Sequence, residues 1–148
     1  MAIAVRNVQT TWEGSLASGS GILAQSTSGA LSGLATTWAS RTEQPGGKTS
    51  PEELAAAAHS SCFSMALALR LGEHDAPPQQ LQVEAAVTLD EVDGLPTIVS
   101  SALQVRARVT GLDAAGFAAI VDEAAALCPV SRLFAGATIT VDAQLETS

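Results

Sequence analysis

Two cysteines are the residues in this sequence best suited to redox chemistry. Cys62 and Cys128 are far apart in the chain and form no Cys-x-x-Cys pair. If the fold brings them together, one thiolate could attack a substrate and the other thiol could resolve the product. Two alternatives stay open. A free cysteine is often a small buried hydrophobic residue. The cysteines could also bind a metal with His59 and His74, although close pairs of zinc ligands are missing.

Three charged or titratable residues near Cys62 could support a reactive thiol. Arg41 lies in a polar loop over residues 40–50, ahead of Cys62, and an arginine close to a thiol lowers the thiol pKa. Glu52 could orient Arg41 through an ion pair, or it could simply face the positive end of a helix dipole. His59 could act as a general base, although a hydrogen-bonded structural role is more common for such a histidine.

The element that must position Cys62 is a predicted helix over residues 50–71. Ser50 suits the N-cap, Pro51 suits the first helical position, and Glu53 completes a capping box with Ser50. Gly72 is the expected end of the helix. Because the interior is apolar nearly all round, we expect a central helix covered on most sides. Its length and its polar residues make it a poor membrane span.

The remaining elements predict an α+β fold. Strands are expected over residues 2–13, 21–24 and 30–39, followed by the loop at 40–50. A hairpin is expected from strands at 81–90 and 98–109 around Asp93-Gly94. A helix starting at Asp113 and ending near Cys128, a further helical turn at 130–134 and a strand at 138–145 complete the chain. We expect antiparallel sheets around the Cys62 helix and one domain over residues 1–148.

Charge and composition exclude several classes of partner. The net charge is −8, with a pI near 4.5, and the seven basic residues are scattered. Neither a nucleic acid nor an anionic membrane is therefore expected as a partner. The first residues hold no apolar segment long enough for a signal peptide, which predicts a cytoplasmic location. No cofactor and no bound metal are expected.

Two motifs resemble those of a known family. The first runs Ser50-Pro51-Glu52-Glu53-Leu54 and continues to His59-Ser60-Ser61-Cys62-Phe63-Ser64-Met65. It resembles the peroxidatic motif of the OsmC/Ohr family of thiol-dependent peroxidases. The second, Cys128-Pro129-Val130-Ser131, resembles the second-cysteine motif of the same family. His59 and Glu53 make the chain more similar to the OsmC branch than to the Ohr branch.

The resemblance implies a fold and a reaction. The fold would be the OsmC α+β fold, an intertwined homodimer with the cysteine helices between two sheets. The substrate would be a hydroperoxide, preferably organic. The resemblance implies that Cys62 becomes a sulfenic acid and then a disulfide with Cys128, which a dithiol such as a lipoylated protein reduces. It also implies that Glu52 pairs with Arg41 beside the attacking sulfur.

Two further expectations accompany this resemblance. An apolar wall would suit alkyl or lipid hydroperoxides, and we expect it to be made of Leu54, Phe63, Met65 and Phe134. The alternative function is an OsmC-like redox sensor or a small-molecule-binding stress protein that uses the same cysteines without fast turnover.

Overall fold

The computed structural model describes residues 1–146 and divides into two compact units. The first unit comprises residues 1–54, and the second begins at Ala55. The expectation of one domain over residues 1–148 therefore stays a prediction.

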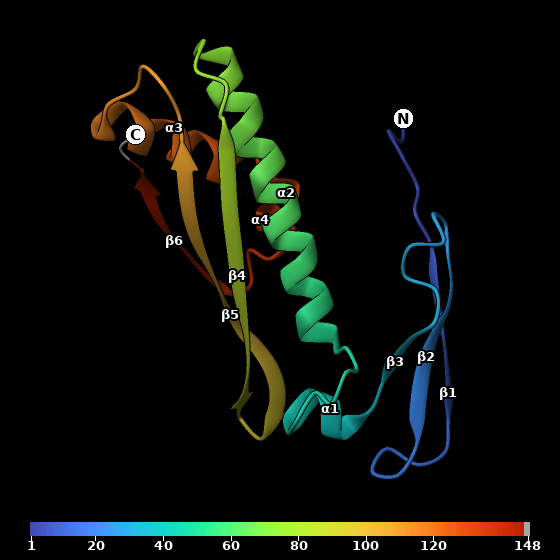
Figure 1. Cartoon of the computed structure of the whole chain (residues 1–148). Coiled ribbons are helices and arrows are strands. Elements are labelled where there is room, and N and C mark those ends of the chain that lie inside the picture. The colour runs from blue at the N-terminus through green and yellow to red at the C-terminus, as the bar shows by residue number, and fades with distance from the viewer. Residues whose placement is uncertain (147–148) are drawn as a thin grey trace. The chain divides into compact units, whose positions relative to one another are not determined.

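The first unit holds a small antiparallel sheet and a short helix (Figure 1). Strands β1 (Val8–Glu13), β2 (Ser20–Ser26) and β3 (Leu34–Thr36) pair in that order, and α1 (Trp38–Thr42) follows. Two predicted strands were too long. The first begins at Val8, and the third ends at Thr36. The third strand ends there because Thr37 caps α1, accepting a hydrogen bond from the Ser40 amide at 2.9 Å.

Helix α2 (Pro51–Glu73) begins as predicted, except for one contact. The Glu53 amide donates to Ser50 Oγ at 3.1 Å, which is the predicted N-cap contact. The Glu53 carboxylate, however, accepts from Thr49 Oγ1 at 2.8 Å. The side chain that was expected to complete the capping box thus holds the residue before Ser50.

The end of α2 lies beyond Gly72, so the predicted stop was wrong. The Ala76 amide donates to the Leu71 carbonyl at 2.9 Å, and the Asp75 amide donates to the Gly72 carbonyl at 3.1 Å. This pair of bonds is a Schellman motif, which requires a left-handed residue after the helix. Asp75 takes that conformation, with φ of 56°. Aspartate tolerates it better than most residues, so the chain needs no glycine there.

The second unit contains a three-stranded sheet in the order β4-β5-β6. Strands β4 (Gln80–Val92) and β5 (Leu95–Arg108) form the predicted hairpin, in which Asp93 and Gly94 both have positive φ. Helices α3 (Ala114–Leu127) and α4 (Pro129–Leu133) then lead to β6 (Thr138–Leu145). Strand β6 is parallel to β5, which differs from the expected antiparallel pairing. The helical crossover between the two strands makes the parallel pairing possible.

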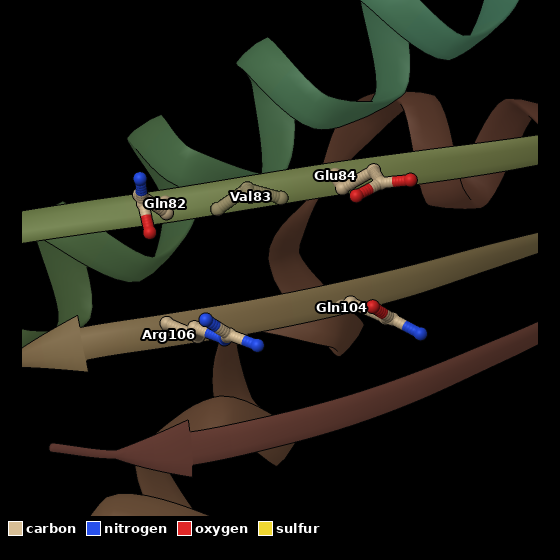
Figure 2. A pocket seen from close by; sticks show the side chains of 5 residues that line it. All are labelled: Gln82, Val83, Glu84, Gln104 and Arg106. Carbon is tan, nitrogen blue, oxygen red and sulfur yellow. The ribbon is translucent and has the colours of Figure 1, made fainter.

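The core of the second unit lies on one face of this sheet, between the sheet and helices α2 and α3 (Figure 1). Its largest buried apolar side chains are Phe63, Leu67, Leu71, Leu103, Val105, Phe117 and Ile120. The outward face of the sheet is polar and holds a shallow hollow, shown in Figure 2. Its lining is Gln82, Val83, Glu84, Gln104 and Arg106, with neither cysteine among them.

Within the single chain, helix α2 is buried along one side, so the expectation that it is covered on most sides stays a prediction. His59, Phe63 and Leu67 are fully buried, whereas Met65 and Leu69 are 71% and 52% exposed. A single chain supplies one packing surface for this helix. By length and composition α2 could cross a membrane, but the core helix of a soluble protein passes the same test, and α2 contributes to this core.

Candidate active site

The structure brings the two cysteines together in the second unit. Both thiols are free, and they are close enough for each to shift the pKa of the other. Cys62 lies in the middle of α2 and is half-buried, whereas Cys128 is fully buried. No group of three His, Cys, Asp or Glu residues arranged to hold a metal occurs within residues 1–146. Two adjacent free thiols can form a disulfide if one of them is first oxidised.

Cys128 lies at the corner between α3 and α4. Its amide donates to the Ala124 carbonyl at 2.9 Å and closes α3. Its sulfur accepts from the Ser131 amide at 3.5 Å and so serves as the N-cap of α4. Pro129 occupies the first turn of α4, where its missing N–H costs nothing. The Cys-Pro-x-Ser sequence therefore ends one helix, starts the next and fixes the sulfur at the corner.

The surroundings of the two thiols move their pKa values apart. Burial raises the pKa of Cys62, and the neighbouring Cys128 raises it further. Burial by itself would also raise the pKa of Cys128. Hydrogen bonds from the Ser131 side chain and backbone, from Cys62 and from the Val130 backbone outweigh it, so the pKa of Cys128 is lowered. Within this pair, the proton favours Cys62 and the negative charge favours Cys128.

His59 is fully buried one turn before Cys62 and has a partner at each ring nitrogen. Nδ1 lies 2.6 Å from Ser101 Oγ on β5, and Nε2 lies 2.8 Å from Ser131 Oγ on α4. The ring of Phe134 contacts the imidazole edge-on, with centroids 5.3 Å apart. Burial lowers the pKa of His59, so the ring is neutral at neutral pH. The hydrogen-bonded structural role expected for His59 is observed, with partners that the sequence interpretation did not name.

The predicted ion pair between Arg41 and Glu52 forms within the first unit. Arg41 Nε donates to Glu52 Oε1 at 2.9 Å, and Nη2 donates to the same oxygen at 2.8 Å. Glu52 is buried, which favours the paired geometry over a freely solvated carboxylate. The guanidinium also lies over the Trp38 ring, 5.8 Å from its centroid. Arg41 is therefore held from two sides by residues of its own unit.

The expected apolar wall is only partly available to a substrate. Phe63 is fully buried in the core and cannot contact a ligand, so its inclusion was wrong. Phe134 is only partly buried and lines an apolar hollow that continues from α4 to β5. Exposed Leu133 and Ile98 also line this hollow. An alkyl chain could occupy such a surface, although the hollow is open rather than enclosed.

Comparison with known proteins decides the family. The family model described as OsmC-like protein matches residues 44–144, a stretch that contains Glu52 and both cysteines. The chain belongs to the OsmC family. Within this family, it is 42% identical over 139 residues to Peroxiredoxin OsmC of Escherichia coli strain K12. That alignment covers 94% of this chain and 95% of the relative.

Solved structures of the OsmC and Ohr type have the same fold. The organic hydroperoxide resistance protein OhrB of Bacillus subtilis superposes with a TM-score of 0.66 at 25% identity, covering 95% of this chain and 98% of that one. An organic hydroperoxide resistance protein OsmC from Legionella pneumophila has a TM-score of 0.68 at 23% identity and covers 99% and 100% of the two chains. The predicted α+β OsmC-like fold is thus confirmed.

Two serines of the site were missed by sequence reasoning. Ser131 stands within the second-cysteine motif, three residues after Cys128. Ser101 stands on β5 two residues before Leu103, on the face of the strand that packs into the core. A serine at an inward strand position must find a hydrogen-bond partner. That requirement was the available signal for Ser101.

The buried imidazole predicts a pH-dependent stability. Because the folded pKa of His59 is lowered, the unfolded chain binds a proton below about pH 6.5 that the folded chain does not bind. The neutral, buried His59 therefore contributes its full share to the free energy of unfolding above that pH. As the pH falls below it, the free energy of unfolding decreases by up to about 1.4 kcal/mol per pH unit. Urea unfolding between pH 5 and pH 8 measures this. His59→Gln should be less stable than the wild type at pH 8, but its free energy of unfolding should depend less on pH. The variant of the exposed histidine, His74→Gln, should keep the wild-type dependence on pH.

Proposed function

We propose that this protein is a thiol peroxidase that reduces hydroperoxides with Cys62 and resolves the product with Cys128. The observation that carries the proposal is the pair of neighbouring free thiols, one half-buried and one fully buried. A peroxide can reach the half-buried sulfur, and the buried sulfur is adjacent to it. The names of the relatives support the same chemistry, since one is called a peroxiredoxin and another an organic hydroperoxide resistance protein.

The proposed reaction has two oxidative steps. Cys62 loses its proton, and its sulfur attacks the peroxide oxygen that does not carry the alkyl group. The O–O bond breaks, an alkoxide leaves and takes up a proton, and Cys62 becomes a sulfenic acid. The Cys128 sulfur then attacks the Cys62 sulfur, the S–O bond breaks and water is released. The sum converts two thiols and one hydroperoxide into a disulfide, an alcohol and water.

In this proposal, Arg41 supplies the charge that Cys62 lacks. Burial raises the pKa of Cys62, so the attacking thiolate needs a positive partner. A guanidinium is always charged and can hydrogen-bond both a thiolate and the developing alkoxide. The hydrogen bond that Arg41 Nε donates to Glu52 fixes the plane of the guanidinium in advance. Such preorganisation reduces the reorganisation needed in the transition state.

The substrate would be organic and the reductant a dithiol. The hollow lined by Ile98, Leu133 and Phe134 offers apolar surface for an alkyl chain, which hydrogen peroxide cannot use. After each turnover the disulfide would be reduced by thiol–disulfide exchange, for which a small dithiol or a lipoylated protein is suited. A cytoplasmic location fits two cysteines that work as free thiols between turnovers.

We also propose that two copies form a homodimer through the exposed face of α2. Met65 and Leu69 lie on this face and are more than half exposed, beside the exposed Ala58. An apolar helical stripe of this kind is favourable to cover with protein. A second copy of the chain is the partner that the OsmC resemblance implies.

Mass spectrometry after one equivalent of cumene hydroperoxide tests the reaction. The wild-type protein should lose two hydrogen atoms and yield a peptide linked through Cys62 and Cys128. Cys62→Ser should give no peroxide reduction, since the attacking sulfur is gone. Cys128→Ser should reduce one equivalent and stop as a sulfenic acid or over-oxidised product. Two unchanged thiols in the wild type would reject the peroxidase reaction. A disulfide that forms without turnover on a dithiol would instead favour the redox sensor.

Arg41→Lys tests the role of the guanidinium. Lysine keeps the charge but loses the planar fork that Glu52 orients, so oxidation of Cys62 should slow by about 10- to 100-fold. Stopped-flow measurement of a single turnover isolates this step from the reduction by dithiol. Arg132→Lys, at the exposed end of α4, is the matched control and should react at the wild-type rate. Equal rates for Arg41→Lys and the control would remove Arg41 from the mechanism.

Multi-angle light scattering after gel filtration tests the dimer. The wild-type chain should elute with twice its 15.0 kDa mass. Met65→Asp places a charge on the proposed contact surface and should weaken the dimer, because burying an unpaired charge is costly. Leu133→Asp, also exposed but on α4, serves as the control and should leave the dimer intact. A monomeric wild type at all concentrations would contradict the proposal.

A further inference from the structure

The guanidinium of Arg41 makes two contacts of different kinds. Its Nε and Nη2 donate to Glu52 Oε1 at 2.9 and 2.8 Å, which fixes one edge of the group. Its flat face lies over the ring of Trp38, with 5.8 Å between Cζ and the ring centroid. The proposed mechanism uses the ion pair with Glu52 and leaves the contact with Trp38 without a role.

The backbone that carries Arg41 is fixed independently of both contacts. The buried hydroxyl of Ser40 donates to the Thr49 carbonyl at 2.9 Å, and the Thr49 amide donates to the Ala35 carbonyl of β3 at 2.9 Å. These bonds tie α1 and β3 to the segment just before α2. Trp38 and Arg41 are three residues apart on α1, so they lie on the same face of this helix. The freedom that remains is that of the long arginine side chain.

The ion pair alone leaves the guanidinium some of this freedom. Arginine and glutamate both have several rotatable bonds, so the two groups can swing together while their hydrogen bonds stay intact. Trp38 has only two side-chain torsions and is half-buried, and its ring is therefore a rigid surface. The Arg41 side chain is 29% exposed, and a partly desolvated cation is attracted to an aromatic face more strongly than a fully solvated one. The ring thus opposes the movement that the ion pair permits.

We propose that Trp38 is a positioning residue, which acts on the reaction by holding the guanidinium of Arg41. With one edge on Glu52 and one face on Trp38, the donors left for other groups are both of those on Nη1 and the second on Nη2. Within residues 1–146, no group accepts a hydrogen bond from Nη1. In the mechanism these donors would serve the thiolate and the leaving alkoxide. The inference rests on the proposed peroxidase function, in which Arg41 acts on Cys62.

A role for Trp38 in packing alone leads to different expectations. A ring that only fills space could be replaced by an aliphatic side chain, and its loss would have the same effect with or without Arg41. A ring that holds a cation needs its π face, and its effect disappears when the cation is removed. Trp38→Phe keeps an aromatic face, whereas Trp38→Leu removes it.

Nitrogen-15 NMR of the Arg41 Nε–H group gives the first test, because it requires no peroxide and no turnover. Arg41→Lys lacks this signal and so assigns it. Exchange of the Nε–H with water should be about 3- to 10-fold faster in Trp38→Leu than in the wild type, and near the wild-type rate in Trp38→Phe. Trp12→Leu, the same substitution at the other tryptophan of the chain, is the control. Equal exchange in Trp38→Leu and the control would overturn the inference, whatever the protein does with peroxides.

Single-turnover oxidation of Cys62 by cumene hydroperoxide gives the second test. Trp38→Leu should slow this step by about 3- to 10-fold, the equivalent of one cation–π contact. Trp38→Phe should recover most of the rate, and Trp12→Leu should react like the wild type. In an Arg41→Met background, Trp38→Leu should cause no further loss, because no cation remains to be held.

The outcomes of the two tests separate the inference from the peroxidase proposal. An equal loss of rate from Trp38→Leu with and without Arg41 would contradict the positioning role. A wild-type protein whose Cys62 is not oxidised would reject the peroxidase function instead, and the exchange of the Arg41 Nε–H would then decide the role of Trp38. Circular dichroism checks that each variant is folded, and Trp38→Met replaces Trp38→Leu if the leucine variant is not.

Discussion

The arrangement of the thiols depends on satisfying a neutral imidazole in a buried position. His59 has no exposed surface, so each ring nitrogen must find a partner within the protein. The partners, Ser101 and Ser131, come from β5 and α4, and the contact therefore fixes α2 against both elements. Cys62 follows His59 by three residues on α2, and Cys128 precedes Ser131 by three residues at the start of α4. Residues three apart share one helical face. The contact that satisfies the histidine thus also sets the two sulfurs side by side.

The two units contain different electrostatic arrangements. In the second unit the thiols lie among apolar side chains, where burial disfavours a thiolate and only local donors oppose it. In the first unit a buried carboxylate holds a guanidinium through charge-assisted hydrogen bonds. When one of two neighbouring thiols ionises, the sulfur with more hydrogen-bond donors holds the charge better. In this pair that sulfur belongs to Cys128. For Cys62 to be the attacking sulfur, a positive group from outside the pair must act on it, and Arg41 is the group we propose.

Local sequence signals predicted the elements well but their ends less well. Asp93-Gly94 identified the hairpin turn, and Asp113 identified the start of α3, because both positions have specific backbone requirements. Gly72 did not end α2, since a helix can pass through glycine and Asp75 could adopt the left-handed conformation instead. The ion pair of Arg41 with Glu52 followed from residue type and from family resemblance. Ser101 could not be found that way, because its role comes from the pairing of β5 with a distant helix. A serine on the inward face of a strand predicts some hydrogen-bond partner, but the partner cannot be named until the helix packed against that strand is known.

The position of Cys62 on α2 explains why one sulfur is accessible and the other is not. Along the helix, His59 and Ala66 are buried, whereas Ala58 and Met65 are exposed. These four residues lie three or four positions from Cys62, so they are its neighbours on the helix surface. Cys62 therefore lies at the boundary between the face that packs on the sheet and the face that the chain leaves open. A sulfur one position further into the buried face, where Phe63 lies, would have no route for a substrate. A sulfur on the open face would lose its contact with Cys128. In the reaction that we propose, the boundary position lets the Cys62 thiol meet both a peroxide and the sulfur of Cys128.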